Sequence, residues 1–223
     1  RNGATTGTGS VKFAVTGSAT NPSDKSDFGS AFPTGTVNFA ANEISKAVTI
    51  NVKGETLFEL DETFAVTLNT PVGGVLGTTA TAVATILNDD TGITIAATDA
   101  SKSEGTGSDS TPFTFTVTRL GNLNVASSVK FAAAANGSGA AAASASDFVG
   151  NKFPTGVVNF AIGEATKLVT LPVIADATLE GNESFKVTLS SPTGASLTTT
   201  TFATGTIQND DALLSIAATS AIK

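Results

Sequence analysis

Carboxylates are the side chains of this sequence whose types and spacing could do chemistry. They lie at turns and strand ends instead of within the alternating strands. We select as candidate metal ligands Glu104, Asp147, Asp176, Glu180, Asp210 and Asp211, with Asp27, Glu55, Glu59, Asp89 and Asp90 at matching places earlier in the chain. Loops at one end of a β-sandwich converge, so five or six carboxylates would meet there and repel one another unless a cation neutralised them. An all-oxygen, flexible ligand set suits Ca²⁺ better than Mg²⁺.

The alternative for these acids is that they are solvated turn residues, because Asp and Asn favour turns. The two interpretations are balanced for a single residue such as Asp147. For Glu62 and Glu183, each just before a strand, a bond to a nearby backbone amide is favoured over ligation. The repetition of the whole set at matched positions favours a metal site.

Composition excludes several classes of function. The 223 residues include no His, Cys, Trp, Tyr or Met, so a zinc site of the usual kind, a thiol nucleophile and a Ser-His-Asp triad are excluded. With 12 basic and 19 acidic residues, nucleic acid is not an expected partner. The apolar runs are too short for membrane insertion. An acidic, Cys-free chain rich in Thr, Ala and Gly is typical of a bacterial secreted protein, so we expect an extracellular or cell-surface location.

An internal repeat organises the chain. Residues 32–40 (FPTGTVNFA) recur at 153–161 (FPTGVVNFA), 121 positions later, and residues 88–90 (NDD) recur at 209–211 with the same offset. Repeats of this length predict tandem domains. We assign residues 1–90 to a repeat that lacks its first strands, 91–211 to a complete repeat, and 212–223 to the first strand of a following repeat or to a donor strand.

Two interpretations are open for a chain that holds an incomplete repeat, a complete repeat and one strand of a further repeat. The chain could be a window from a longer tandem array. Alternatively, the strand expected at 213–220 could be donated to the incomplete first repeat of a neighbouring chain, because an unpaired sheet edge is a template for another strand. Donation would join identical subunits head to tail in a filament. The residues Thr91 and Gly92 are expected to form a short linker between the repeats, stiffened by an ion beside it.

Apolar and polar residues alternate with period two in short runs separated by turn signals. Residues 48–52, 64–68, 93–98, 113–119, 169–173 and 185–189 are the expected strands. This pattern predicts an all-β fold of antiparallel β-sandwiches. The low-complexity segment 132–146 (AAAANGSGAAAASAS) is expected to be a loop because it contains two glycines and lies between strands.

These residues together resemble the Calx-beta family. The resemblance is carried by the order SEG, FTFTVTRLG, SDF, VNFAIGEATKLVTLPV, the loop D-x-x-x-E-x-x-E-S-F and the closing I-Q-N-D-D. The family includes the cytosolic calcium-sensing domains of sodium–calcium exchangers and many extracellular bacterial repeat proteins. It implies immunoglobulin-like sandwiches in tandem, with Ca²⁺ held at one tip by the eleven acids named above.

Two departures from the calcium-sensing members reduce the charge of the expected site. The chain has Ala175-Asp176 and Gly54-Glu55 where those members have two acids, and Asn-Asp-Asp where they have three. We therefore expect fewer or weaker ions, and a non-enzymatic structural module of a surface adhesin, stalk or fibre, whose adhesion ligand the sequence does not identify. Glycoside hydrolysis by paired carboxylates such as Asp176 and Glu180 is disfavoured, because the acids recur in both repeats and no Trp or Tyr is present to bind sugar.

Overall fold

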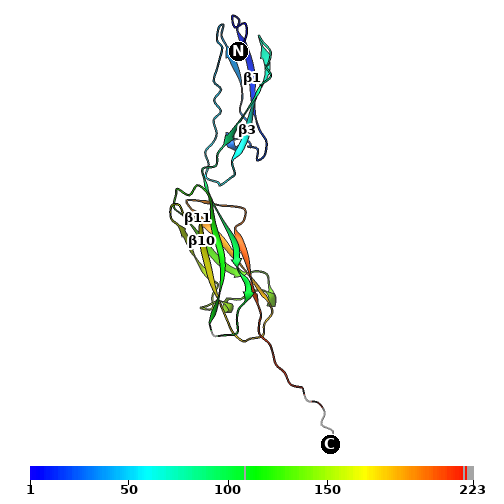
Figure 1. Cartoon of the computed structure of the whole chain (residues 1–223), viewed down its shortest axis with the longest axis vertical. Coiled ribbons are helices and arrows are strands. Elements are labelled where there is room, and N and C mark those ends of the chain that lie inside the picture. Colours follow the sequence, from blue (N-terminus) through cyan, green and yellow to red (C-terminus); the bar gives the residue numbers. More distant parts are fainter. Residues whose placement is uncertain (108, 218, 220–223) are drawn as a thin grey trace. The chain divides into compact units, whose positions relative to one another are not determined.

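The computed structural model describes residues 1–107, 109–217 and 219. The chain divides into two units, Arg1–Asp89 and a second that begins at Asp90. The regular secondary structure of both consists of β-strands and a few short 3-10 helices (Figure 1), which confirms the all-β class. No helix in the described part of the chain is long and apolar enough to cross a membrane.

The second unit is a sandwich of two sheets. One sheet has the strand order β10-β7-β5-β12 and the other has the order β6-β13-β11-β8-β9. Most neighbouring strands are antiparallel. The exceptions are two short strands: β6 pairs in parallel with β13, and β12 pairs in parallel with β5. The elements are β5 (Thr91–Asp99), β6 (Ser101–Ser103), β7 (Ser110–Gly121), β8 (Ser127–Ala135), η2 (Gly139–Ala141), η3 (Ala145–Asp147), β9 (Thr155–Phe160), β10 (Thr166–Ile174), β11 (Glu183–Thr193), β12 (Ser196–Leu197) and β13 (Phe202–Gln208).

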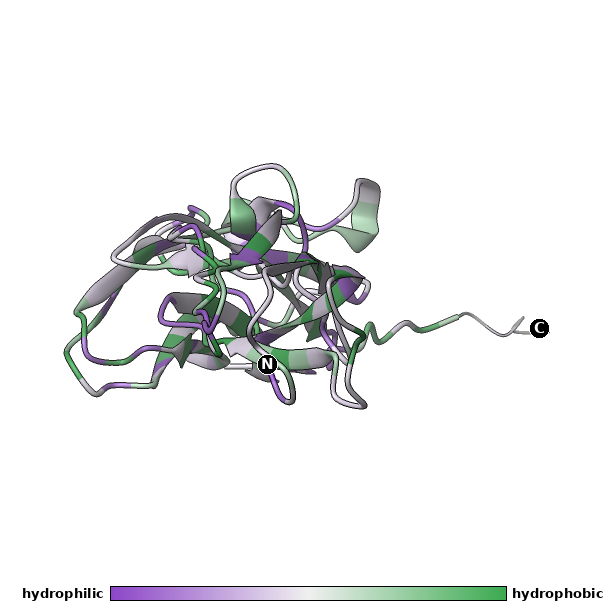
Figure 2. Ribbon diagram, turned by 90° about the horizontal axis from the view of Figure 1, so that it is seen from above, coloured by the Kyte–Doolittle hydropathy of each residue, from purple (hydrophilic) through white to green (hydrophobic). Residues whose placement is uncertain are grey.

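The core of this sandwich lies between its two sheets. Alternate residues along the strands face inward, as the period-two pattern predicts, and Figure 2 shows apolar and polar stretches following one another along the ribbon. Phe185 on β11 lies at the centre, with ring centroids 5.9 Å from both Phe113 and Phe115 on β7 and 5.3 Å from Phe148. All four rings are fully buried.

The first unit is a single four-stranded sheet with the order β2-β1-β3-β4. It corresponds to β9-β8-β11-β13 of the second unit, and the repeat extends to close contacts: a Cβ at Gly35 would lie 2.6 Å from the Phe13 ring, as one at Gly156 would from Phe131. The elements are β1 (Gly9–Gly17), η1 (Ser26–Phe28), β2 (Thr34–Phe39), β3 (Glu62–Val72) and β4 (Thr81–Ile86).

Four expectations from the sequence need correction. Residues 48–52 form no strand, because their counterpart β10 pairs with β7 and the first unit has no equivalent of β7 to supply hydrogen bonds. Thr91 and Gly92 are not a linker but the buried start of β5. Within the segment expected to be a loop, residues 132–135 belong to β8, where Ala133 packs into the core. Residues 213–217 form no strand, and residues 218 and 220 of the expected donor strand lie outside the described residues.

Candidate metal centre

The register of the strands brings the acidic loops of the second unit to one end of the sandwich. The start of β11 pairs with the end of β13, with Glu183 opposite Ile207. The end of β10 pairs with the start of β7, and the end of β6 lies beside the end of β13. The loops that follow β6, β10 and β13, the helix η3 and the start of β11 therefore meet at the same end.

One group at this end joins the segment after β6 to the segment after β13. One carboxylate oxygen from each of Glu104, Asp210 and Asp211 lies within 4.8 Å of the other two. Glu104 is only 4% exposed although it carries a carboxyl group. Its position is fixed through its backbone, because its carbonyl oxygen accepts a hydrogen bond from the Thr111 hydroxyl on β7.

A second group joins η3 to the loop before β11. It consists of Asp147, Glu180 and Glu183, again with one oxygen of each within 4.8 Å of the others. The Asp147 carboxylate is held in place because it caps its own short helix, where its Oδ2 accepts a 2.6 Å hydrogen bond from the Ser144 backbone N–H. A carboxylate that is already oriented loses less side-chain entropy when it binds an ion.

The two groups influence each other electrostatically. The pKa of Glu104 is raised to about 7, first by burial and then by the charges of Glu180, Asp176 and Asp211. The pKa of Glu183 is raised to about 8 by burial, by its hydrogen bond with Asp147 and by the charge of that residue. The negative charges of the two groups therefore repel one another across this end of the sandwich.

Burial and mutual repulsion also raise the pKa of two further acids at this end. For Glu180 the cause after burial is the charge of Asp147, and for Asp211 it is the charge of Asp210. None of the ion pairs formed by the described residues, Lys46–Glu43, Lys102–Asp99 and Lys167–Glu164, includes an acid of this end.

Asn209 links the acidic loop before β11 to the closing acids. Its side-chain oxygen accepts a 3.0 Å hydrogen bond from the Glu180 backbone N–H, and its Nδ2 donates to the Asp211 carbonyl oxygen at 3.0 Å. In the first unit, the side-chain oxygen of Asn88 likewise accepts from the Glu59 N–H at 3.2 Å. Asn209 therefore positions the acidic loop beside the closing acids. A carboxylate could accept the first of its hydrogen bonds but could not donate the second.

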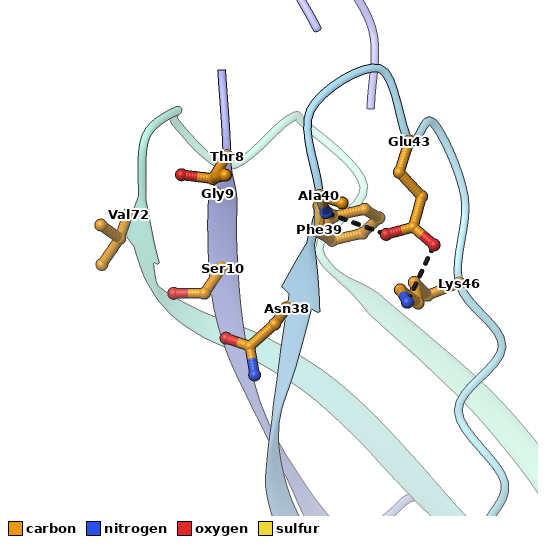
Figure 3. Close-up of a pocket in the computed structure, with 9 residues that line it drawn as sticks. All are labelled: Thr8, Gly9, Ser10, Asn38, Phe39, Ala40, Glu43, Lys46 and Val72. Carbon is orange, nitrogen blue, oxygen red and sulfur yellow. Dashed lines mark hydrogen bonds and ion pairs between the residues drawn. The ribbon is translucent and has the colours of Figure 1, made fainter. Parts of the chain in front are cut away.

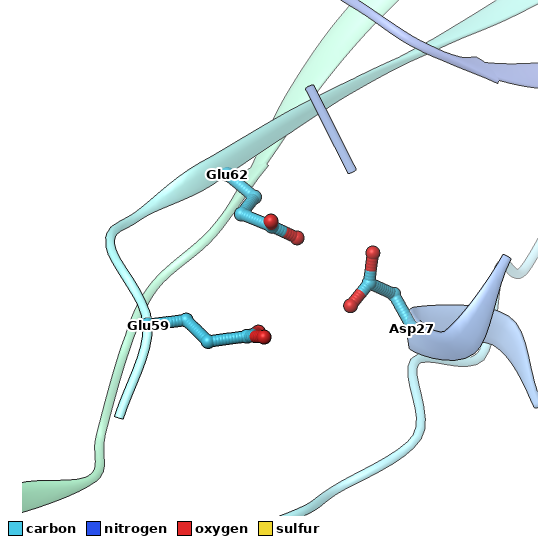
Figure 4. A group of neighbouring side chains, drawn as sticks. All are labelled: Asp27, Glu59 and Glu62. Carbon is cyan, nitrogen blue, oxygen red and sulfur yellow. The ribbon is translucent and has the colours of Figure 1, made fainter. Parts of the chain in front are cut away.

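The first unit contains a counterpart of the second group. Oxygens of Asp27, Glu59 and Glu62 lie within 4.8 Å of one another. Figure 4 shows the three carboxyl groups pointing toward one another, with Asp27 on η1, Glu59 in the loop before β3 and Glu62 at the start of β3. Burial, the hydrogen bond with Asp27 and the charge of Asp27 raise the pKa of Glu62 to about 7. This unit has no residue equivalent to Glu104, since that part of the repeat is missing.

The structure places the eleven predicted ligands as follows. Seven lie in the three groups: Glu104, Asp210 and Asp211, then Asp147 and Glu180, then Asp27 and Glu59. Asp176 and Glu55 lie outside the groups and accept hydrogen bonds within their own loops, from the Thr178 and Leu57 backbone N–H groups. Asp89 ends the first unit and Asp90 begins the second, and neither belongs to a group.

Glu62 and Glu183 belong to the groups although the sequence favoured a bond to a nearby amide for them. Each is the first residue of a strand and points its carboxyl group at the Asp of the preceding short helix. The signal that could have found them is their exact recurrence at the same offset as the other acids.

The oxygens of this end fit a hard cation. Oδ2 of Asp211 and Oε2 of Glu183 are buried and have no hydrogen-bond partner among the described residues. A buried carboxylate oxygen without a partner is costly, and an ion would satisfy it. Because every donor is a carboxylate oxygen, the chemistry of the set selects Ca²⁺ or a similar ion over a transition metal.

The family model described as Calx-beta domain matches residues 1–90 and again residues 88–211. The chain belongs to the Calx-beta domain family. A search of curated proteins finds no match.

Several solved structures are similar to the chain at low identity. The structure titled "Crystal structure of Apo-form Calx CBD1 domain" is 23% identical, covers 54% of this chain and 98% of its own, and has a TM-score of 0.45. The two-domain "Crystal structure of CBD12 from CALX1.2" is 22% identical, with coverage of 93% and 90% and a TM-score of 0.40. A third, "Crystal structure of calcium binding domain CBD12 of CALX1.1", is 23% identical, with coverage of 87% and 71% and a TM-score of 0.41.

Proposed function

We propose that the chain is a non-enzymatic structural module whose tandem β-domains are stiffened by Ca²⁺. The observation that carries the proposal is the pair of adjoining carboxylate groups at one end of the second unit, in which burial and neighbouring charges raise the pKa values of Glu104 and Glu183. Such an arrangement destabilises the folded state unless a cation is bound. Membership of the Calx-beta family and the names of the similar solved structures support the choice of calcium.

The residues of the two groups would share the work of holding the ions. Glu104, Asp210 and Asp211 would hold one ion, and Asp147, Glu180 and Glu183 would hold another. Bound Ca²⁺ supplies positive charge that cancels the repulsion between loops. The loops that follow β6, β10 and β13 would then be tied to each other and to β11, which stiffens this end of the sandwich.

We place the protein outside the cell or on its surface, as part of an adhesin, stalk or fibre with neighbouring repeats or identical subunits as partners. The acidic, Cys-free composition supports this location. Extracellular calcium-binding modules need only a Kd on the order of 10⁻⁴ to 10⁻³ M, which matches a site with Asn in place of one acid. The absence of Trp and Tyr from the sequence disfavours a carbohydrate-processing role for the carboxylates.

The test is a calorimetric melt of the chain in EDTA, in 10 mM Ca²⁺ and in 10 mM Mg²⁺. At a Kd of about 10⁻⁴ M, 10 mM Ca²⁺ stabilises the folded state by ~2.7 kcal/mol for each ion bound, so the melting temperature of the second unit should rise clearly in Ca²⁺ and less in Mg²⁺. The double variant Asp210→Asn/Asp211→Asn should lose most of that rise. A melting temperature unaffected by Ca²⁺ would overturn the proposal.

A second candidate function is a subunit of an extracellular filament that polymerises by donation of residues 213–220. The match of residues 214–219 (LSIAAT) to residues 93–98 (ITIAAT) of β5 at the repeat offset of 121 supports it. Electron microscopy of concentrated chain with and without residues 212–223 tests it. Filaments formed equally by the truncated chain would exclude strand donation.

A further inference from the structure

The turn that follows β8 contains an Asn-Gly pair. Asn136 and Gly137 come directly after Ala135, the last residue of β8, and residues 136–138 belong to no strand or helix. Gly137 has a φ of 113°, in the left-handed region that residues with a Cβ rarely adopt. Asn-Gly is a common turn pair for this reason. It is also the pair in which the backbone nitrogen after an Asn is least shielded, because Gly has no side chain.

The backbone nitrogen of Gly137 is open to reaction. Its N–H donates no hydrogen bond to any described residue. Apart from its two chain neighbours, no heavy atom lies within 4 Å of the position that a Cβ on Gly137 would occupy. Residues 137–141 are all exposed. Neither a hydrogen bond nor packing therefore holds this nitrogen away from the neighbouring Asn136 side chain.

Asn136 lies at the base of a closed loop. Its backbone N–H and that of Ala143 both donate to the Ser184 carbonyl oxygen, each at 3.0 Å, so residues 137–142 form a loop between two anchored ends. The Asn136 side chain is half-buried, and its Nδ2 donates to the Ser184 hydroxyl oxygen at 2.9 Å. This hydrogen bond slows rotation of the amide but leaves its carbon within one residue of the Gly137 nitrogen.

We propose that Asn136 is a site of spontaneous deamidation. The Gly137 nitrogen loses its proton to solvent and attacks Cγ of Asn136. The new C–N bond closes a succinimide ring, and Nδ2 takes up a proton and leaves as ammonia. Water then opens the ring at either carbonyl carbon, which gives Asp with the original backbone or isoaspartate with the backbone routed through the side chain. The whole reaction consumes one water, releases one ammonia and needs no oxidant or reductant.

The fold can accommodate both products. The altered linkage joins residues 136 and 137, whereas the anchors of the loop are the N–H groups of Asn136 and Ala143. The extra methylene of isoaspartate therefore falls within the exposed loop and leaves both anchors in place. In the Asp product the direction of the side-chain hydrogen bond reverses, because a carboxylate only accepts and the Ser184 hydroxyl can donate to it.

Deamidation adds a negative charge at the end of the sandwich that carries the carboxylate groups. Ser184, the partner of the Asn136 amide, follows Glu183 in β11, and Glu183 belongs to the group with Asp147 and Glu180. A further negative charge here increases the repulsion that the group already experiences. The product should therefore be less stable than the parent in EDTA, and bound Ca²⁺ should narrow the difference. This consequence rests on the proposed function, whereas the reaction itself does not.

Peptide mapping by mass spectrometry tests the reaction. The folded whole chain and a urea-unfolded sample are incubated at pH 8 and compared with chain digested at once. Trypsin releases residues 131–152 as one peptide and residues 2–12, with the other Asn-Gly pair, as another. We expect Asn136 of the folded chain to convert to a mixture of Asp and isoaspartate, faster at higher pH.

Two exposed Asn residues serve as controls within the same chain. Asn151 lies in the same tryptic peptide and is followed by Lys152. Asn38 lies on β2, lines the groove of the first unit shown in Figure 3 and is followed by Phe39. Both are accessible to solvent, but the side chain of the next residue shields the backbone nitrogen. Neither should change during the incubation that converts Asn136.

Two substitutions separate the contributions of the turn and of the amide. Gly137→Ala places a Cβ beside the attacking nitrogen and should slow the reaction by at least about tenfold. Ser184→Ala removes the hydrogen bond that holds the amide and should speed the reaction by roughly fivefold. An Asn136 that stays intact in the folded chain while the urea-unfolded chain converts overturns the proposal, as does an equal rate in the parent and in Gly137→Ala.

The variant Asn136→Asp tests the consequence for stability. Its melting temperature should lie below that of the parent in EDTA, and the difference should shrink in 10 mM Ca²⁺. Equal melting temperatures in EDTA would show that the new charge does not reach the carboxylate groups. Peptide mapping and calcium melts are separate readouts, so a parent melt that ignores Ca²⁺ overturns the proposed function and leaves the deamidation site standing.

Discussion

Replacing Glu104 by Gln should change the stability of the second unit in opposite directions with and without Ca²⁺. Glu104 is 4% exposed, and its pKa is raised from its usual 4.5 to about 7 by burial and by neighbouring carboxylates. A carboxyl group with a raised folded-state pKa stabilises the fold only while it is protonated. That stability is fully present below pH 4.5 and is lost as the pH rises through about 7.

The size of the effect follows from the pKa difference. At 1.36 kcal/mol for each pKa unit, ionisation of Glu104 costs the folded state ~3 kcal/mol at pH 8. Because Gln carries no charge, the variant in EDTA at pH 8 should be more stable by up to that amount, which corresponds to roughly 10 °C in the melting temperature for a unit of this size. At pH 4.5 the gain should nearly vanish.

Calcium should reverse the sign. In 10 mM Ca²⁺ the parent gains the binding free energy of the ion held by Glu104, Asp210 and Asp211, while the variant loses a charged ligand and most of that gain. The assay is differential scanning calorimetry at pH 8 with and without Ca²⁺. The control is Glu164→Gln, because Glu164 pairs with Lys167 instead of with other acids and its replacement should give the same small change in both buffers. A Glu104→Gln variant that is destabilised equally in EDTA and in Ca²⁺ would refute the reasoning.

Three further predictions concern the same unit. In EDTA the urea midpoint should fall as the pH rises from about 5 through about 8, because the folded-state pKa of Glu183 is raised to about 8. Bound Ca²⁺ should flatten this dependence on pH. A midpoint that rises over this range would contradict the raised pKa of Glu183. Asn209→Ala removes the acceptor that holds the Glu180 loop and should weaken Ca²⁺ binding by roughly tenfold in calorimetric titration, whereas unchanged affinity would show that the loop is held by other contacts. Arg119→Met should lower the free energy of unfolding by about 3 kcal/mol, because buried Arg119 donates to the Val125 and Leu123 carbonyl oxygens. The loss, measured by urea denaturation, should be equal with and without Ca²⁺.

The sequence by itself determined the period-two strands, the repeat and the chemistry of the acidic loops. These features are local or follow from self-comparison. The alternation at 185–189 places Phe185, Val187 and Leu189 inside because a strand exposes alternate side chains to opposite faces, and this is where the structure buries them. The absence of His and Cys limits any metal site to oxygen ligands.

Only the tertiary structure decided which strands form and which acids meet. Residues 48–52 have the same alternation as residues 169–173, yet they form no strand because a strand needs a hydrogen-bonding neighbour and β7 is present in one unit alone. In the same way, register brings Glu183 to Asp147, while the local turn keeps the Asp176 carboxylate on the Thr178 N–H. Composition and spacing define what the side chains can do, but hydrogen-bond pairing between distant segments fixes where they lie.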